Sequence, residues 1–168
     1  MSAVIMAFYL EELASDYLTN TMQAGLDLAL NLDGDLGLEG AHTTDEVQRI
    51  LANLTHVCSE FVNSICQSTC EVPEILSYVT FLMHQAMAPY PEHNKKVLSS
   101  FLVRRFFCPA LVRPEDYLLE EDSGELSKQV MNAFKVAVRA LESMADGEQL
   151  RTKAVSYTHL TLPTIRLV

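Results

Sequence analysis

Two adjacent arginines, Arg104 and Arg105, lie inside the otherwise almost wholly apolar run FLVRRFFCPALVRP, residues 101–114. A buried guanidinium has to be satisfied by carbonyl or carboxylate oxygens, because burying it without a partner costs several kcal/mol. A helix that ends at a proline offers carbonyl groups without intrahelical donors. We therefore expect at least one of the two arginines to brace backbone carbonyls. A purely structural clamp is the alternative to a functional role.

Three further cations follow with helical spacing. Lys128, Lys135 and Arg139 are seven and four residues apart, which aligns them on one helix face. Taken alone, such a stripe is more often a solvated face than a binding site. It stands out because the chain has 22 acidic and 12 basic side chains and a formal charge of -10. That balance argues against bulk affinity for nucleic acid or anionic membranes, because the mean field repels both.

A metal site is a weaker interpretation of the remaining candidates. Zinc is the metal that the residue types of His56, Cys58, Cys66 and Cys70 would suit, but these residues lack the paired short spacings of structural zinc sites. Core or surface thiols are the favoured interpretation, and four cysteines without a secretory signal fit a reducing cytosol. The sequence has no phosphate-binding glycine loop, nucleophile elbow or zincin motif.

Helices are the elements that must position these residues. Apolar side chains recur at three- and four-residue spacing, and the few glycines and prolines fall mostly between the periodic segments. Thr43 and Glu46 form a capping-box signature, while Pro109 and Pro114 are expected to end the helix that carries the two arginines. The sequence predicts an all-α chain without a sheet, with helices over residues 2–18, 19–32, 47–65, 75–86, 92–107 and 125–145.

The last fourteen residues do not continue this pattern. The tail VSYTHLTLPTIRLV, residues 155–168, has no helical periodicity. Its first ten residues closely resemble the translation of a transposon adapter used to make sequencing libraries. We therefore expect one domain over residues 1–154 and a non-native tail over residues 155–168. Without the tail the chain loses one arginine and no acidic residue, so its acidic character stands.

The run FLVRRFFCPALVRP resembles the signature of Ras GTPase-activating domains. In that signature a Phe-Leu-Arg step precedes an aromatic or aliphatic pair, followed by Cys or Asn, Pro and Ala. The resemblance extends from Pro73 to Ala110 and into KVAVRALESMAD, which looks like the family's lysine-bearing segment ending in Ala-Asn. SAVIMAFYLEELASDYL resembles the helix that follows the family's catalytic loop. The resemblance implies a multi-helix domain of this type over nearly all of residues 2–150.

The resemblance also implies roles for individual residues. Arg105 matches the arginine that braces the catalytic loop through its carbonyls, with Pro109 and Ala110 on the signature's helix-breaking pair. The cations that would face acidic surface on the GTPase are Lys128, Lys135 and Arg139.

Four features depart from the family pattern. Arg104 replaces a typical leucine, Asp146 stands where asparagine is common, and Arg139 stands where lysine is usual. The family's arginine finger lies in a short loop just before the helix that residues 2–18 resemble, and no arginine precedes Arg49. We therefore expect a fragment truncated before its finger, in which no residue is assigned a catalytic role.

As a whole, the resemblance implies an activator of a Ras-like small GTPase that stimulates GTP hydrolysis and down-regulates Ras signalling. The partner in its GTP-bound state would hold the nucleotide and Mg²⁺, so the chain would need no cofactor and would not itself be an enzyme. We expect a cytoplasmic location, with any recruitment to the inner membrane surface left to flanking domains. The alternative is a scaffold module of IQGAP type that binds the GTPase without activating it. A helical domain with no GTPase partner is a third, weaker interpretation.

Overall fold

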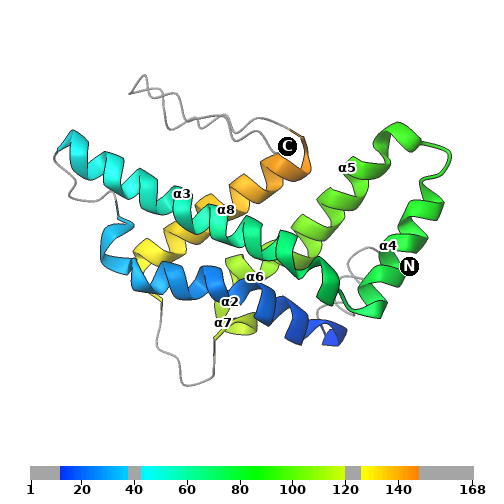
Figure 1. The fold of residues 1–168 in the computed structure, drawn as a ribbon, viewed down its shortest axis with the longest axis horizontal. Helices are drawn as coiled ribbons and strands as arrows, with labels where there is room; N and C mark the ends of the chain where they lie inside the picture. The colour runs from blue at the N-terminus through cyan, green and yellow to red at the C-terminus, as the bar shows by residue number, and fades with distance from the viewer. Residues whose placement is uncertain (1–11, 38–42, 120–125, 148–168) are drawn as a thin grey trace.

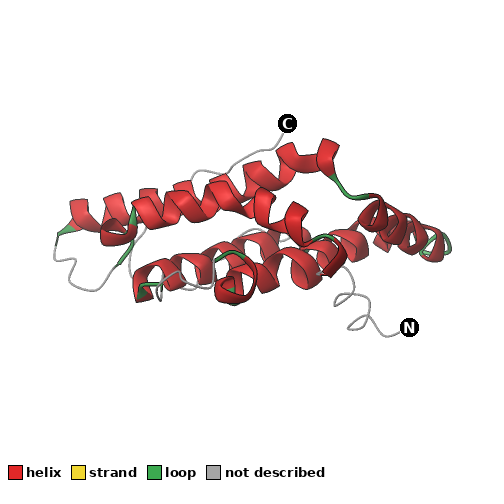
Figure 2. Cartoon of the chain, turned by 90° about the horizontal axis from the view of Figure 1, so that it is seen from below, coloured by secondary structure: helices red, strands yellow, loops and turns green. Residues whose placement is uncertain are grey.

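The computed structural model describes residues 12–37, 43–119 and 126–147, which form helices joined by turns (Figure 1). Figure 2 shows no strand in any of these three segments, and the predicted all-α class is confirmed. The α-helices are α2 (Ser15–Asn31), α3 (Thr44–Gln67), α4 (Glu74–Ala86), α5 (Pro91–Leu102), α6 (Cys108–Val112), α7 (Pro114–Tyr117) and α8 (Lys128–Ala145). The 3-10 turns η1 (Asp33–Asp35) and η2 (Ser68–Glu71) and the π-helical turn η3 (Val103–Phe107) complete the set. The predicted tail and most of the predicted first helix lie outside the described residues.

Helix α2 corrects one predicted boundary. We expected separate helices to meet between residues 18 and 19, but α2 runs unbroken from Ser15 to Asn31. Neither glycine nor proline lies near the predicted junction, and Thr19 uses its hydroxyl to bond the Tyr117 carbonyl at 3.0 Å rather than to cap a helix. The chain is instead irregular at Ala14, which is the N-cap residue of α2.

Helix α3 begins as the capping box predicts. The Thr43 hydroxyl accepts from the Glu46 backbone N–H at 3.2 Å, and the Glu46 carboxylate accepts from the Thr43 N–H at 3.0 Å. Both donors would otherwise lack an intrahelical acceptor. The predicted apolar face is also confirmed, because Ile50, Leu54 and Phe61 are buried.

The segment that carries the two arginines is longer than predicted. Helical structure continues from α5 through the π turn into α6, so the prediction that Pro109 ends the helix is wrong. In the π turn the Cys108 N–H bonds to the Val103 carbonyl, five residues back. This wider turn precedes Pro109, which occupies the first turn of α6, where a missing N–H costs little. The helical run ends only at Arg113, before Pro114.

The core lies where α2, α3, the π turn and α8 meet. Phe61 of α3 and Phe134 of α8 are fully buried and meet edge to face, with ring centroids 5.8 Å apart. Phe106 of the π turn is also fully buried and stacks on Tyr17 of α2 at 6.2 Å. Helices α4 and α5 form a hairpin that projects from this bundle (Figure 1). The core therefore fixes α8 and the π turn, which carry the predicted site residues.

Candidate functional site

Helix α8 presents the three predicted cations to solvent. Lys128, Lys135 and Arg139 are all exposed, while the opposite face is buried against α3 and α6. None of the three makes an ion pair with another described residue. No acidic residue lies on α8 before Glu142. We refer to Lys128, Lys135 and Arg139 as the cationic stripe. It can attract acidic surface, because its charges are not already neutralised within the described chain.

The orientation of the stripe is set by the start of α8 and by its buried face. Ser127 is the N-cap residue, and its hydroxyl accepts from the Val130 N–H at 3.2 Å. The same hydroxyl contacts the Asp33 carboxylate, which ties the start of α8 to the turn after α2. Helix α8 begins at Lys128 rather than at the predicted residue 125.

Arg105, the predicted brace, faces solvent. It is exposed in the π turn. Phe106 and Phe107 take the inward positions of the π turn, and this turns the preceding arginine side chain toward solvent. Arg105 makes no hydrogen bond or ion pair with another described residue. Its role as a brace stays a prediction.

Pro109 and Ala110 have structural surroundings. Ala110 is fully buried, and α6 packs against α8, so its small side chain lies within the core. Pro109 is half-buried in the same turn. These positions explain the two residues through packing and backbone geometry. A further contribution of either residue to a loop stays a prediction.

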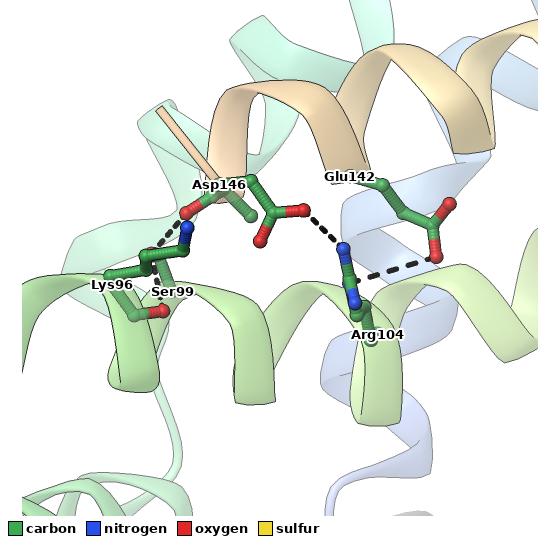
Figure 3. Close-up of polar contacts among 6 residues, drawn as sticks. Lys96, Ser99, Arg104, Glu142 and Asp146 are labelled. Atoms are coloured by element: carbon green, nitrogen blue, oxygen red, sulfur yellow. Dashed lines mark hydrogen bonds and ion pairs between the residues drawn. The ribbon is translucent and has the colours of Figure 1, made fainter. Parts of the chain in front are cut away.

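Arg104 is paired, as the sequence allowed for one member of the arginine pair. Its guanidinium binds the Asp146 carboxylate, and its Nε lies 3.8 Å from a Glu142 carboxylate oxygen (Figure 3). Close by, the Ser99 hydroxyl lies 2.9 Å from the Ala145 carbonyl, with the Lys95 carbonyl of its own helix as the alternative acceptor at 2.8 Å. We call Ser99, Arg104, Glu142 and Asp146 the clasp. It joins α5 and the π turn to the C-terminal end of α8.

The clasp is the part of the site that sequence reasoning missed. Arg104 and Asp146 were both identified as departures from the family pattern, but as separate ones. The signal that could have joined them is their opposite charge, since two unusual charges of opposite sign are often partners. Glu142 was not singled out, although it is one helical turn before Asp146.

The four cysteines differ in burial, and one of them, Cys108, lies beside the clasp. Burial and then the Glu142 carboxylate raise the pKa of Cys108 to about 12, while the Arg104 guanidinium partly offsets this rise. Burial also raises the pKa of Cys58 to about 11. Cys66 and Cys70 are exposed, and no group of three metal-ligating side chains gathers in the described segments. The favoured interpretation of these residues as thiols agrees with this placement.

Within the described residues, no helix combines the length and the apolar character that a membrane crossing needs.

Two comparisons relate the chain to known proteins. Residues 26–143, from the middle of α2 into α8, match the profile of the family described as GTPase-activator protein for Ras-like GTPase. The inhibitory regulator protein IRA2 of Saccharomyces cerevisiae (strain ATCC 204508 / S288c) is 26% identical over 137 residues. The match covers 80% of this chain and 4% of that protein, so the chain spans only a small part of the length of this relative.

Proposed function

Since the chain belongs to the family of GTPase-activator proteins for Ras-like GTPases, we propose that it docks on a Ras-like GTPase in the GTP-bound state. The observation that carries this proposal is the cationic stripe. Its three side chains are exposed, lie on one helix face and have no ion-pair partner among the described residues. In a chain of formal charge -10, such a stripe is the surface best suited to an acidic partner.

The complete domain then stimulates GTP hydrolysis and so down-regulates Ras signalling. The reaction belongs to the GTPase, which holds the nucleotide and Mg²⁺. An activator of this kind lends an arginine whose positive charge stabilises the negative charge that develops on the transferred phosphoryl group. For Ras-type GTPases such an arginine raises the rate by about 10³–10⁵. Arg105, exposed and unpaired among the described residues, is available to hold the loop that carries this arginine.

The finger itself is assigned to no residue of this chain. No arginine precedes Arg49, so the 168-residue chain docks without supplying the finger. Binding without activation is also the behaviour of the alternative, a scaffold module of IQGAP type. The residue at the finger position in a longer sequence separates the two: an arginine there favours the activator, and another residue favours the scaffold. We place either function in the cytoplasm, with flanking domains recruiting the protein to the inner membrane surface.

Nucleotide-dependent binding tests the proposal. The chain is titrated against a Ras-type GTPase loaded with GDP or with a non-hydrolysable GTP analogue, and binding is followed by calorimetry. We expect measurable affinity for the analogue-loaded form and weaker affinity for the GDP form. Absence of binding to both forms would contradict docking.

Single-turnover hydrolysis tests the assignment of the finger. We expect the GTP hydrolysis rate of the GTPase to stay nearly unchanged when the chain is added in stoichiometric amount. The reason is that no guanidinium would reach the transferred phosphoryl group. A strong acceleration by the isolated chain would refute this part of the proposal.

A further inference from the structure

The carboxylates of the clasp continue the cationic stripe along α8. Lys135, Arg139, Glu142 and Asp146 are four, three and four residues apart, so they follow one another on the same helix face. The stripe therefore changes sign at its C-terminal end. Two carboxylates next to Arg139 would repel an acidic partner that approaches the cations.

Arg104 offsets part of the negative charge at this end of the stripe. Its guanidinium reaches both carboxylates from the π turn, and the Asp146 side chain is only 21% exposed in this arrangement. The Arg104 side chain is 43% exposed, so the ion pair contributes little to folding, because water screens it and both side chains lose freedom. Its larger effect is on the local field, where it offsets the negative charge at the end of the cationic stripe.

The clasp also holds two parts of the docking surface together. The last carbonyls of a helix lack intrahelical donors, and the Ala145 carbonyl lies 2.9 Å from the Ser99 hydroxyl, whose one proton it shares with the Lys95 carbonyl at 2.8 Å. A guanidinium near the C-terminal end of a helix also interacts favourably with its dipole. Ser99 and Arg104 therefore fix the end of α8 against the segment that carries Arg105.

The Asp146 charge would be unfavourable for docking without Arg104 opposite it. Arg104 stands where the resembling family typically has leucine, and Asp146 stands where asparagine is common. Asp146 alone would add a negative charge beside the stripe. With Arg104 opposite, the two departures offset each other.

We propose that Arg104 is a positioning residue for GTPase docking, which acts by pairing with Asp146. The pair screens the acidic end of α8 and sets the π turn with Arg105 against the cationic stripe. This inference rests on the proposed function, and it adds to it a residue that need not touch the GTPase.

A set of substitutions tests the pairing. Binding to a Ras-type GTPase loaded with a non-hydrolysable GTP analogue is measured for the wild-type chain, Arg104→Leu, Arg104→Lys and the double variant Arg104→Leu with Asp146→Asn. We expect Arg104→Leu to weaken binding by about 3–10-fold, since it exposes the carboxylates to the partner. Arg104→Lys keeps a cation and retains most of the affinity. The double variant removes both charges and recovers binding to within about 2-fold of the wild type.

Arg113→Leu is the matched control. Arg113 also forms an exposed ion pair with an aspartate, Asp116, at 3.1 Å, but at the junction of α6 and α7. It should leave affinity unchanged. Melting temperatures of all variants show whether each one is folded, and we expect only small shifts, because the arginine of each ion pair is exposed to water.

Two results would overturn the inference while leaving the proposed function intact. One is that the wild-type chain binds the GTPase and the Arg104→Leu variant binds it equally tightly. The other is a double variant that stays as weak as Arg104→Leu, since this would mean that Arg104 acts without Asp146. A wild-type chain that fails to bind would instead overturn the proposed function, and the inference with it.

Discussion

At the scale of single residues, the four thiols differ in their ability to ionise. Cys58 and Cys108 are shielded from water, and burial raises the pKa of these thiols to about 11 and about 12. Cys66 and Cys70 lie exposed around the end of α3. Because the thiolate is the reactive form, the two buried thiols should react more slowly than the two exposed ones.

We expect iodoacetamide at pH 8 to modify Cys66 and Cys70 well before Cys58 and Cys108. Peptide mass spectrometry over a time course measures the order, and the urea-unfolded chain, in which all four should react alike, is the control. Early modification of Cys108 would contradict its burial.

The raised pKa values of Cys58 and Cys108 also predict how the stability of the fold depends on pH. Below the ordinary pKa of 9.0 the two thiols are protonated in the folded and the unfolded chain. Above it the unfolded chain loses these protons first, so the free energy of unfolding falls as pH rises toward 11–12.

Gly25 marks a close approach of α2 to α3. A Cβ at this position would lie 2.4 Å from two ring atoms of Phe61, which is fully buried against Phe134. We expect Gly25→Ala to lower the free energy of unfolding by about 1–3 kcal/mol, because the ring has no free space to move into. Urea denaturation measures the loss. Gly34→Ala is the control, since a Cβ there meets nothing within 4 Å; equal losses in both variants would contradict the packing explanation.

The arginine pair shows how far residue types alone can be interpreted. The conflict between charge and an apolar run was visible in the sequence, and Arg104 resolves it through carboxylates of α8 and its C-cap rather than through the backbone carbonyls that we expected. The exposure of Arg105 could not be predicted, because the direction of its side chain depends on the π turn. One additional residue in a helical turn rotates every later side chain, and the sequence carries no periodic signal for it.

At the scale of elements, the start of α3 depends on a local signal. Thr43 and Glu46 satisfy each other's backbone N–H groups, and both lie within one turn of the helix. Such a contact needs no tertiary structure, which is why the sequence predicts it well.

We expect Thr43→Ala to destabilise the chain by about 1 kcal/mol, since it leaves the Glu46 N–H without its acceptor. Thr55→Ala on the same helix is the control. The Thr55 hydroxyl donates to the Leu51 carbonyl in the middle of α3, where alanine is the better helix former. Thermal unfolding compares the two variants. A larger loss for Thr55→Ala would show that the cap is not what stabilises this end of α3.

The elements predicted less well depend on a contact distant in sequence or on a turn that has no periodic signal. The junction expected in the middle of α2 rested on composition, whereas Thr19 in fact bonds the Tyr117 carbonyl from within a continuous helix. The end expected at Pro109 rested on the cost of proline in a helix interior. That rule was overridden by a π turn that leads into Pro109.

At the scale of the whole molecule, charge separates one surface from the rest. The chain has a formal charge of -10, yet α8 carries no acidic residue before Glu142. The all-α class and the helical alignment of Lys128, Lys135 and Arg139 were predictable, because both follow from periodicity. The clasp was not predictable in the same way, since it joins residues 42 positions apart across two helical segments.

Charge reversal on the cationic stripe tests the central claim most directly. Lys135→Glu is compared with Lys95→Glu, which makes the same charge change on an exposed lysine of α5. Affinity for a Ras-type GTPase loaded with a non-hydrolysable GTP analogue is measured beside the melting temperature. We predict that Lys135→Glu weakens binding at least about 10-fold with little change in melting, because it places a negative charge against acidic surface, while Lys95→Glu binds nearly as the wild type does. Unchanged affinity in Lys135→Glu, or an equal loss in both variants, would contradict docking through the stripe.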